Sequence, residues 1–397
     1  MPVHTGLERL VTSQTRLLAG KRVGIICNQA SVGRDFVSVV EQVRRMPGVT
    51  IGALLGPEHG VRGEAQDMIA VEAGGAEGHI DRQLGVPVYS LYGDSFESLT
   101  PTPKMLQGLD ALVFDMQDVG SRYYTFYATM TYAMRAAKAA GIGFIVLDRP
   151  NPLGGVEIEG GVQKPGFDSF VGPFPIPVRH GLTMGELAQW ANTVLGIGCD
   201  LTVVQMEGWR RDMLWEATGL PFIPPSPNMP TPDTARVYPG MCLVEGTNLS
   251  EARGTTRPFE QSGAPFYDPD KLAAALNVLG LPGVIFRSCW YRPTFHKFGG
   301  KDCAGVFLHV TDPTVFKPYR AGLEFVRVAQ AQARDRFQWR TETYEFVDRV
   351  PAIDLLTGSD EVRAAFDAGR DLSGLLPRWA EEEETFRKAR EEFLLYR

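Results

Sequence analysis

Cysteine is scarce in this chain of 397 residues, which contains five: Cys27, Cys199, Cys242, Cys289 and Cys303. Their number is odd, they lie far apart and no C-x-x-C pair occurs, so the pattern excludes a disulfide framework and a zinc finger. Cys27 and Cys242 lie in apolar runs, where cysteine behaves as a small buried hydrophobic residue. No basic surroundings favour a reactive thiolate, so a catalytic cysteine is not expected.

Positive charge and long apolar runs are also lacking. The net charge of −7 argues against a nucleic-acid partner, because such proteins normally carry a basic face. No apolar stretch is long enough to span a bilayer, so no membrane partner is expected. Residues 1–4 lack the basic and apolar segments of a signal peptide, which predicts a cytoplasmic location. The sequence does not indicate an oligomeric state.

Several cofactor and catalytic motifs are missing. The first predicted strand is not followed by G-x-G-x-x-G, and no Walker A spacing occurs, so neither NAD nor ATP is implied and no cofactor is expected. A G-x-S-x-G elbow for a serine nucleophile is absent. Glu58, His59, Asp118 and His180 could converge on a metal ion, but no H-E-x-x-H or comparable spacing supports this, and no metal is predicted. Carboxylate-driven chemistry is left as the leading class.

The first half of the chain alternates apolar runs with helical patterns, and the composition, 44% hydrophobic and 22% charged, is that of a globular protein. Near-continuous apolar runs between helices indicate a parallel sheet covered on both faces. We predict an α/β fold, with a Rossmann-like, doubly wound, mostly parallel sheet domain over 1–262 and a smaller α/β domain over 263–397. Strands are expected at 22–27, 50–55, 86–91, 111–115, 142–148, 201–206, 241–245, 283–288 and 305–310. Helices are expected at 36–46, 124–140, from 183 onward, 270–279, 319–334 and 380–397, and an irregular loop at 221–239.

Polar side chains follow four of the predicted strands, at the point where each strand ends. These ends are Asn28, Glu58 with His59, residues 115–118 and residues 148–151. If the sheet is parallel, they meet at one edge, where ligands bind in open α/β sheets. Each polar group could instead cap the next helix. Four such ends together favour a functional cleft.

Glu58 is the leading candidate for catalysis, with His59 beside it. The two residues lie in a turn bracketed by glycine and proline, Gly-Pro-Glu-His-Gly, directly after a buried apolar run. A carboxyl and an imidazole held there are placed for acid/base chemistry on a bound substrate. The alternative is that the carboxylate only accepts hydrogen bonds from nearby backbone N–H groups.

The turn from 114 to 125 and the later loops are dense in hydrogen-bonding and aromatic groups. Such a set suits a ligand with many hydroxyl groups, because aromatic rings offer apolar platforms with polar tips. Arginines there could clamp a carboxylate bidentately, or pair with neighbouring acids and be structural. The candidate substrate-binding residues are Asn28, Arg62, Asp115, Gln117, Asp118, Arg122, Tyr123, Tyr124, Asp148, Arg149, Asn151, Arg179, His180, Asn228, Glu245, Asn248, Glu251 and Arg253.

Five of these segments together resemble the NamZ-type exo-β-N-acetylmuramidases, a glycoside hydrolase family formerly catalogued as a domain of unknown function. They are GPEHG at 56–60, FDMQDVG at 114–120, VLDRPNP at 146–152, PSPNMP at 225–230 and EGTN at 245–248. The resemblance covers nearly the whole chain and implies removal of terminal, non-reducing N-acetylmuramic acid from peptidoglycan fragments. It also implies Glu58 as the principal catalytic carboxylate and Glu159 as the second. The chain departs from the pattern at Ala252, where relatives usually have glycine, a residue suited to positive φ.

The chemistry of glycosidases agrees with this reading. One carboxylic acid protonates the leaving oxygen, and a second carboxylate acts as base or nucleophile. Muramic acid carries a lactyl carboxylate, which gives Arg149, Arg179 or Arg253 a reason to line the pocket. Two alternatives stay open at this point: a metal-dependent hydrolase or amidase of muropeptides, and a non-catalytic receptor for muropeptides or sugars.

Overall fold

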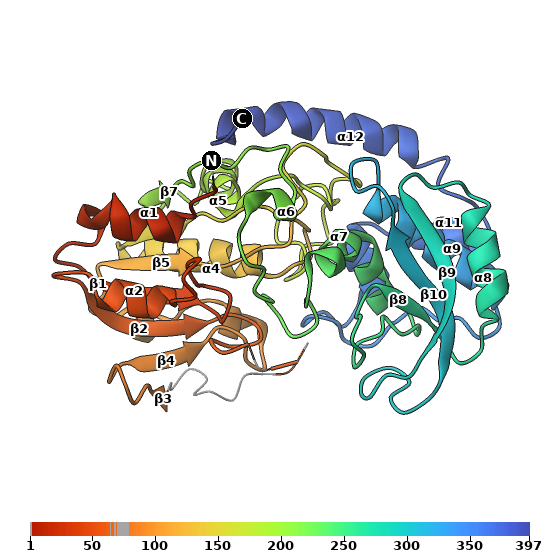
Figure 1. Ribbon diagram of the computed structural model, residues 1–397, viewed down its shortest axis with the longest axis horizontal. Coiled ribbons are helices and arrows are strands. Elements are labelled where there is room, and N and C mark those ends of the chain that lie inside the picture. The colour runs from red at the N-terminus through yellow and green to blue at the C-terminus, as the bar shows by residue number, and fades with distance from the viewer. Residues whose placement is uncertain (1, 64, 67–68, 70–78) are drawn as a thin grey trace.

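The computed structural model describes residues 2–63, 65–66, 69 and 79–397 (Figure 1). It contains two sheets, one of seven strands and one of three. The larger sheet is formed by the first half of the chain and the smaller one by the second half, and the long helix α12 (Leu376–Ala389) lies across the top of the view in Figure 1. Among the described residues, no helix is long and apolar enough to cross a membrane.

The seven-stranded sheet confirms the predicted, mostly parallel α/β fold. Its order is β3-β4-β2-β1-β5-β6-β7, and every pair is parallel except β3 with β4. Each strand coincides with an apolar run except the short β3, and the central strands are buried on both faces. The strands are β1 (Arg22–Cys27), β2 (Thr50–Gly56), β3 (His79–Ile80), β4 (Pro87–Ser90), β5 (Ala111–Asp115), β6 (Gly143–Leu147) and β7 (Leu201–Val204).

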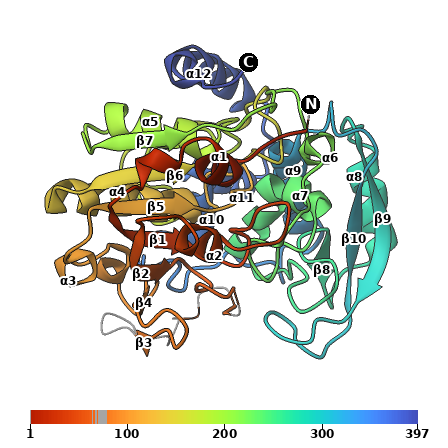
Figure 2. The same cartoon turned by 60° about the vertical axis from the view of Figure 1, so that its left-hand side comes forward.

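Helices cover both faces of this sheet, as Figure 2 shows. Side chains alternate between the two faces along a strand. In β5, Phe114 joins the core cluster that contains α4 and α5, whereas Val113 joins the one that contains α1 and α2. A capping box of Thr183 and Glu186 begins α5, and Gly141 in the left-handed conformation ends α4. The helices are α1 (Gly6–Thr12), α2 (Val39–Arg44), α3 (Pro103–Leu106), α4 (Phe126–Ala140), α5 (Met184–Val194) and α6 (Trp215–Thr218).

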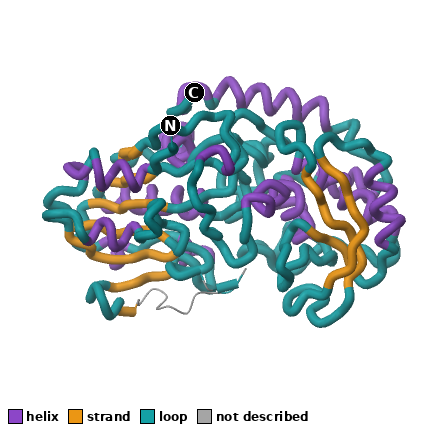
Figure 3. The backbone as a smooth tube through the Cα atoms, viewed as in Figure 1, coloured by secondary structure: helices purple, strands orange, loops and turns teal. Residues whose placement is uncertain are grey.

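The second sheet is antiparallel, with the order β8-β10-β9. Figure 3 shows it as the group of strands beside a separate set of helices. Helix α8 packs on β9 and β10, and α9 packs against α8. The domain boundary at residue 262 stays a prediction. The elements are β8 (Gln261–Ala264), α8 (Pro269–Asn277), β9 (Val284–Tyr291), β10 (Cys303–Val310), α9 (Pro318–Gln332), α10 (Ala352–Thr357) and α11 (Glu361–Asp367).

Two predictions for the middle of the chain are wrong. The proline-dense stretch contains helix α7 (Pro232–Met241), and the predicted strand 241–245 is a 3-10 turn, η3 (Cys242–Gly246), that continues it. Thr231 caps the helix by accepting from the N–H of Thr234, and a proline at the first helical position suits such a start. The short apolar run that follows is buried like a strand, and periodicity alone does not separate the two.

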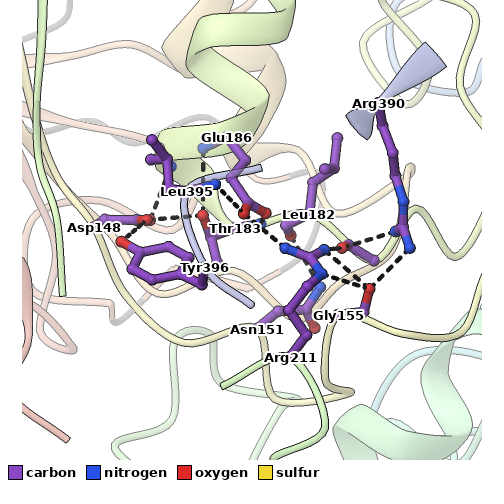
Figure 4. Close-up of polar contacts among 12 residues, drawn as sticks. Asp148, Asn151, Gly155, Leu182, Thr183, Glu186, Arg211, Arg390, Leu395 and Tyr396 are labelled. Atoms are coloured by element: carbon purple, nitrogen blue, oxygen red, sulfur yellow. Dashed lines mark hydrogen bonds and ion pairs between the residues drawn. The ribbon is translucent and has the colours of Figure 1, made fainter. Parts of the chain in front are cut away.

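The C-terminal residues return to the first sheet (Figure 4). Beyond α12, the Tyr396 hydroxyl donates to Asp148 at 2.6 Å, and the N–H of Leu395 donates to Glu186 at 2.9 Å. A charge run such as the one on α12 is usually a solvated helical face. Here Glu382 and Glu383 each accept a backbone N–H at 2.8 Å, from Val162 and Gly160. The last helix is therefore fastened to the first half of the chain.

Candidate active site

A pocket that opens to solvent lies between the carboxyl edge of the first sheet and the second half of the chain, and its empty space is about 440 Å³ when the open solvent is included. Its lining comes from the turn after β2, the start of α4, the 226–229 loop, α7, the 245–259 loop and the 344–345 turn. The lining residues are Glu58, His59, Tyr123, Tyr124, Thr125, Phe126, Val171, Ser226, Asn228, Met229, Tyr238, Glu245, Arg253, Phe259, Tyr344 and Glu345.

Glu58 lies at the wall of this pocket, where the second strand ends. The N–H of Gly60 donates to the carbonyl of Pro57 at 2.9 Å and closes a four-residue turn around it. The carboxyl is 4% exposed, and its Oε2 accepts a hydrogen bond from the Thr125 hydroxyl at 2.6 Å. Thr125 lines the same pocket. The carboxyl is thus oriented by a side chain at the site.

His59 follows in the left-handed conformation, with φ of 71°. A residue other than glycine there costs free energy, and such residues gather at functional sites. The imidazole Nδ1 lies 2.9 Å from the carbonyl oxygen of Ala65, and the side chain is buried. The turn therefore fixes both the carboxyl and the imidazole.

Aromatic rings form a second wall. The ring of Tyr238 meets those of Tyr123, Tyr124 and Phe259 in edge-on contacts, with centroids 5.8, 5.7 and 4.9 Å apart. Burial raises the pKa of Tyr123, Tyr124 and Tyr238 well above the ordinary value, so these hydroxyls stay protonated. The Tyr123 hydroxyl donates to the carbonyl of Pro239 on α7. Protonated hydroxyls and ring faces suit contacts with a sugar.

Arg253 supplies positive charge to the pocket. Its Nη2 donates to Glu245 Oε1 at 2.6 Å, and Glu245 Oε2 accepts from the Tyr344 hydroxyl at 2.7 Å. The guanidinium carbon lies 5.0 Å from the centroid of the Phe259 ring, within the range of a cation–π contact. Arginine, carboxylate and phenol therefore form one connected group across the pocket wall.

Glu251 stands behind Arg253 and is outside the pocket lining. It is fully buried and lies 3.3 Å from Arg253, 3.1 Å from His296 and 3.2 Å from Lys297. Burial opposes ionisation, but Lys297, His296 and Arg253 together hold the pKa of this carboxyl well below its usual range. Ala252, between the two, has φ of 62°, so the loop keeps the left-handed conformation with alanine in place of glycine.

Several of the predicted substrate-binding residues have their hydrogen-bond partners at the sheet edge. Arg149 pairs bidentately with Asp115, at 2.5 and 2.8 Å, and both are buried. Asn28 donates to the carbonyl of Pro225, and Gln117 to those of Asp118 and Pro150. These side chains lie outside the pocket lining.

The predicted residues between β5 and α5 are likewise used internally. Asp118 Oδ2 accepts from the N–H of Gly120 at 2.6 Å and lies 3.8 Å from His180, while burial raises the pKa of Asp118 to about 7 and lowers that of His180 to about 3. Asp148 accepts from Thr183, Gly185 and Tyr396, which ties β6 to α5 and the C-terminus. Asn151 donates to the carbonyl of Leu182.

Glu159, the second carboxylate implied by the resemblance, also lies outside the pocket lining. It is 3.7 Å from Arg179, which donates to the carbonyl of Leu153, and its Oε2 accepts from the N–H of Arg320 at the start of α9. Burial raises the pKa of Glu159 to about 7. Its contacts thus join the first half of the chain to the second.

Three remaining predictions fall at other places. Arg62 lines a separate hollow beside β4, and Asn248 bonds to the backbone of Arg336 and Gln338. Arg122 is wholly buried and donates to three backbone carbonyls. Of the predicted residues, the structure gathers seven at the pocket: Glu58, His59, Tyr123, Tyr124, Asn228, Glu245 and Arg253.

Sequence reasoning missed Glu345, Tyr344, Tyr238 and Phe259. None lies in a segment that ends a strand of the first sheet, and no local motif marks them. Within the described residues, no cluster of three or more histidine, cysteine or acidic side chains is arranged to hold a metal ion.

A Rossmann-like sheet with a carboxylate-lined pocket at its carboxyl edge defines the class as an α/β protein with a candidate acid/base site. Family models for exo-β-N-acetylmuramidase NamZ match residues 23–233, as its N-terminal part, and residues 236–396, as its C-terminal part. The chain belongs to the NamZ family. It is 45% identical over 395 residues to the peptidoglycan β-N-acetylmuramidase NamZ of Bacillus subtilis strain 168, covering 99% of this chain and 91% of that protein.

Two crystal structures of DUF1343 family proteins from Bacteroides fragilis share the fold. One has a TM-score of 0.89 at 36% identity, and the other has a TM-score of 0.77 at 27% identity. Each alignment covers 100% of this chain and 99% of the other. This chain therefore has the fold of these two DUF1343 family proteins.

Proposed function

We propose that this protein is an exo-acting glycoside hydrolase that releases terminal N-acetylmuramic acid from the non-reducing end of peptidoglycan fragments of the MurNAc-GlcNAc type. The observation that carries the proposal is the carboxyl of Glu58 at the wall of a pocket that also holds aromatic rings and Arg253. Membership of the NamZ family supports the same activity. The cytoplasmic location stays a prediction.

Glu58 acts as the general acid in this proposal. The Thr125 hydroxyl fixes one carboxyl oxygen at 2.6 Å, which leaves the other to meet the glycosidic oxygen. Protonating that oxygen lets the C1–O bond break with its electron pair on the leaving sugar. His59, held in the same turn, keeps the backbone geometry that aims the carboxyl.

Arg253 is proposed to bind the lactyl carboxylate of muramic acid. Arg149 and Arg179 were the other candidates, but their partners are Asp115 and Glu159, away from the pocket. Arg253 is fixed at the wall by Glu245 and by the ring of Phe259. A preorganised guanidinium favours bidentate binding of a carboxylate.

Glu58→Gln tests the role of the acid with two substrates. A MurNAc-GlcNAc disaccharide has a poor leaving group that needs a proton, whereas a 4-nitrophenyl MurNAc glycoside has a good one that does not. We expect Glu58→Gln to lower kcat on the disaccharide by about 100-fold or more, the usual worth of general acid catalysis, and to lower it far less on the nitrophenyl glycoside.

The matched control is Glu392→Gln, which changes an exposed glutamate far along the chain and should leave both rates unchanged. Near wild-type turnover of both substrates by Glu58→Gln would refute the assignment. Loss of wild-type activity after exhaustive chelation would favour the metal-dependent hydrolase or amidase. Binding of the disaccharide without product would favour the non-catalytic receptor.

A further inference from the structure

The turn from Tyr344 to Val347 has a backbone that its sequence does not favour. The N–H of Tyr344 donates to the carbonyl of Val347 at 3.0 Å, and the N–H of Val347 returns to the carbonyl of Tyr344 at 2.9 Å. The two residues between them, Glu345 and Phe346, have φ of 45° and 67°. A two-residue hairpin with both φ values positive normally contains Asn-Gly or Asp-Gly. Glutamate and phenylalanine are strained there.

Contacts on both sides of the turn hold it in this conformation. The ring of Phe346 packs against those of Tyr92, Phe96 and Phe170, with centroids 5.5, 6.4 and 6.4 Å apart. The Tyr344 hydroxyl donates to Glu245. Strained backbone that the surrounding structure holds in place is often found at active sites and ligand clamps. The strained turn at 345–346 therefore suggests a functional role for its side chains.

The strained turn places the carboxyl of Glu345 in the pocket. That side chain is 3% exposed, lines the same pocket as Glu58, and accepts a hydrogen bond on Oε2 from the Tyr92 hydroxyl at 3.1 Å. A buried glutamate is uncommon without a specific reason. Glu345 and Glu58 come from segments 287 residues apart in the chain, so tertiary structure alone unites them.

Among the residues that the structure describes, three carboxylates line the pocket, and their contacts differ. Glu245 has one oxygen on the guanidinium of Arg253 and the other on the Tyr344 hydroxyl, at 2.6 and 2.7 Å. A carboxylate with both oxygens engaged is suited to orienting Arg253. Glu345 accepts a hydrogen bond on Oε2 from the Tyr92 hydroxyl. Because both oxygens of Glu245 are engaged in holding Arg253 and Tyr344, Glu345 is left as the carboxylate of the described lining that can act together with Glu58.

We propose that Glu345 is the second catalytic carboxylate, a role that rests on the proposed glycosidase function. As Glu58 gives its proton to the leaving oxygen and the C1–O bond breaks, the Glu345 carboxylate accepts a proton from water while the water oxygen bonds to C1. Atoms and charge balance, because one proton leaves Glu58 and one reaches Glu345. If Glu345 instead bonds to C1 as the leaving sugar departs, water later attacks C1, gives a proton to the Glu58 carboxylate and releases the sugar as its bond to Glu345 breaks.

Glu345→Gln tests this role with little change of shape. Glutamine keeps an oxygen to accept from Tyr92, so we expect a kcat lower by about 100-fold or more, KM within threefold of wild type and an unchanged Tm. Glu342→Gln, three residues away on an exposed part of the same segment, is the matched control and should retain full kcat.

Glu345→Gly is the second variant, because glycine removes the backbone strain together with the carboxyl. We expect its Tm to equal or exceed that of wild type while its kcat is lost. Added azide should restore turnover of the nitrophenyl glycoside and yield a MurNAc azide. In either role azide attacks C1 from the side that Glu345 serves, so the proposal predicts an azide of inverted configuration. The anomer of the MurNAc that the wild-type protein first releases then distinguishes the two roles, because inversion indicates a base and retention indicates a nucleophile.

Two results would overturn the proposal while the wild-type protein still releases N-acetylmuramic acid. One is a kcat of Glu345→Gln within threefold of wild type. The other is a Glu345→Gly variant whose lost activity azide does not restore, which would make Glu345 a positioning residue. If the wild-type protein itself releases no N-acetylmuramic acid, the proposed function fails and this inference falls with it.

Discussion

Arg122 allows a sharp test of which predicted binding residues are structural. Its side chain is 0% exposed, and Nη1 donates to the carbonyls of Gly161 and Ile176 at 3.1 and 2.7 Å. Nη2 donates to the carbonyl of Leu356 on α10 at 2.8 Å. The guanidinium thus joins the start of α4 to a loop of the first half and to a helix of the second. We expect Arg122→Lys to weaken this junction.

The magnitude follows from the three bonds. Lysine has one ammonium nitrogen, whereas Arg122 donates from two guanidinium nitrogens. The lysine therefore reaches one of the three carbonyls, and about two of the three hydrogen bonds are lost. Each hydrogen bond to a charged group contributes about 1.5–3 kcal/mol, so the loss is about 3–6 kcal/mol. The charge stays buried, so no desolvation energy is recovered. At about 2.1 cal/mol/K of unfolding entropy per residue, this lowers Tm by roughly 4–7 °C if the chain unfolds as one unit.

Calorimetry and urea unfolding of Arg122→Lys and of Arg135→Lys measure this effect. Arg135 is an exposed arginine on α4, the helix that follows Arg122, so its replacement should change the unfolding free energy by less than about 0.5 kcal/mol. The KM of the folded Arg122→Lys enzyme should stay within twofold of wild type. A variant as stable as the control but with a tenfold higher KM would refute the structural role and restore Arg122 to the binding site.

Two further predictions concern buried carboxylates. Burial raises the pKa of Asp118 and of Glu159 to about 7, so the stability that each contributes is full below its unfolded pKa near 4 and is lost as pH rises through 7. Denaturant titrations should therefore show a free energy of unfolding that falls from pH 5 to pH 8, and Asp118→Asn should flatten that fall; an unchanged slope would contradict the assignment. Asp115→Asn leaves the charge of Arg149 buried without its partner, so urea unfolding should show a loss of about 3–5 kcal/mol, and adding Arg149→Met should recover part of it.

Much of the fold could be predicted because local patterns and tertiary packing agree. The apolar runs at 22–27 and 111–115 coincide with β1 and β5, and the capping box at Thr183 starts α5. The failure at 241–245 has a physical cause. A short apolar run is buried equally well as a strand or as a helical turn, and the Thr231-Pro232 start that decides between them lies ten residues upstream.

The site was predicted only in part, because a polar strand end has two possible uses. Glu58, Asp115 and Asp148 all follow parallel strands at one edge of the sheet. Asp115 pairs with Arg149, and Asp148 accepts hydrogen bonds from Thr183, Gly185 and Tyr396. Glu58, in contrast, faces the pocket. The partner of Asp115, Arg149, lies 34 residues away in the chain. The partners Thr183 and Tyr396 of Asp148 lie 35 and 248 residues away. The polar strand ends therefore predict which edge of the sheet carries the site, but not which of these side chains face the pocket.

No local sequence pattern marks the strained residues that surround the pocket. Eight residues other than glycine have positive φ in the described part of the chain. His59, Phe259 and Glu345 line the pocket, and Ala252 and Phe346 adjoin residues that do. Glycine or asparagine is the usual sequence marker of this conformation, and neither stands at these positions. The conformation is imposed by tertiary contacts such as those of Phe346, so only the folded chain shows that these strained residues surround one pocket.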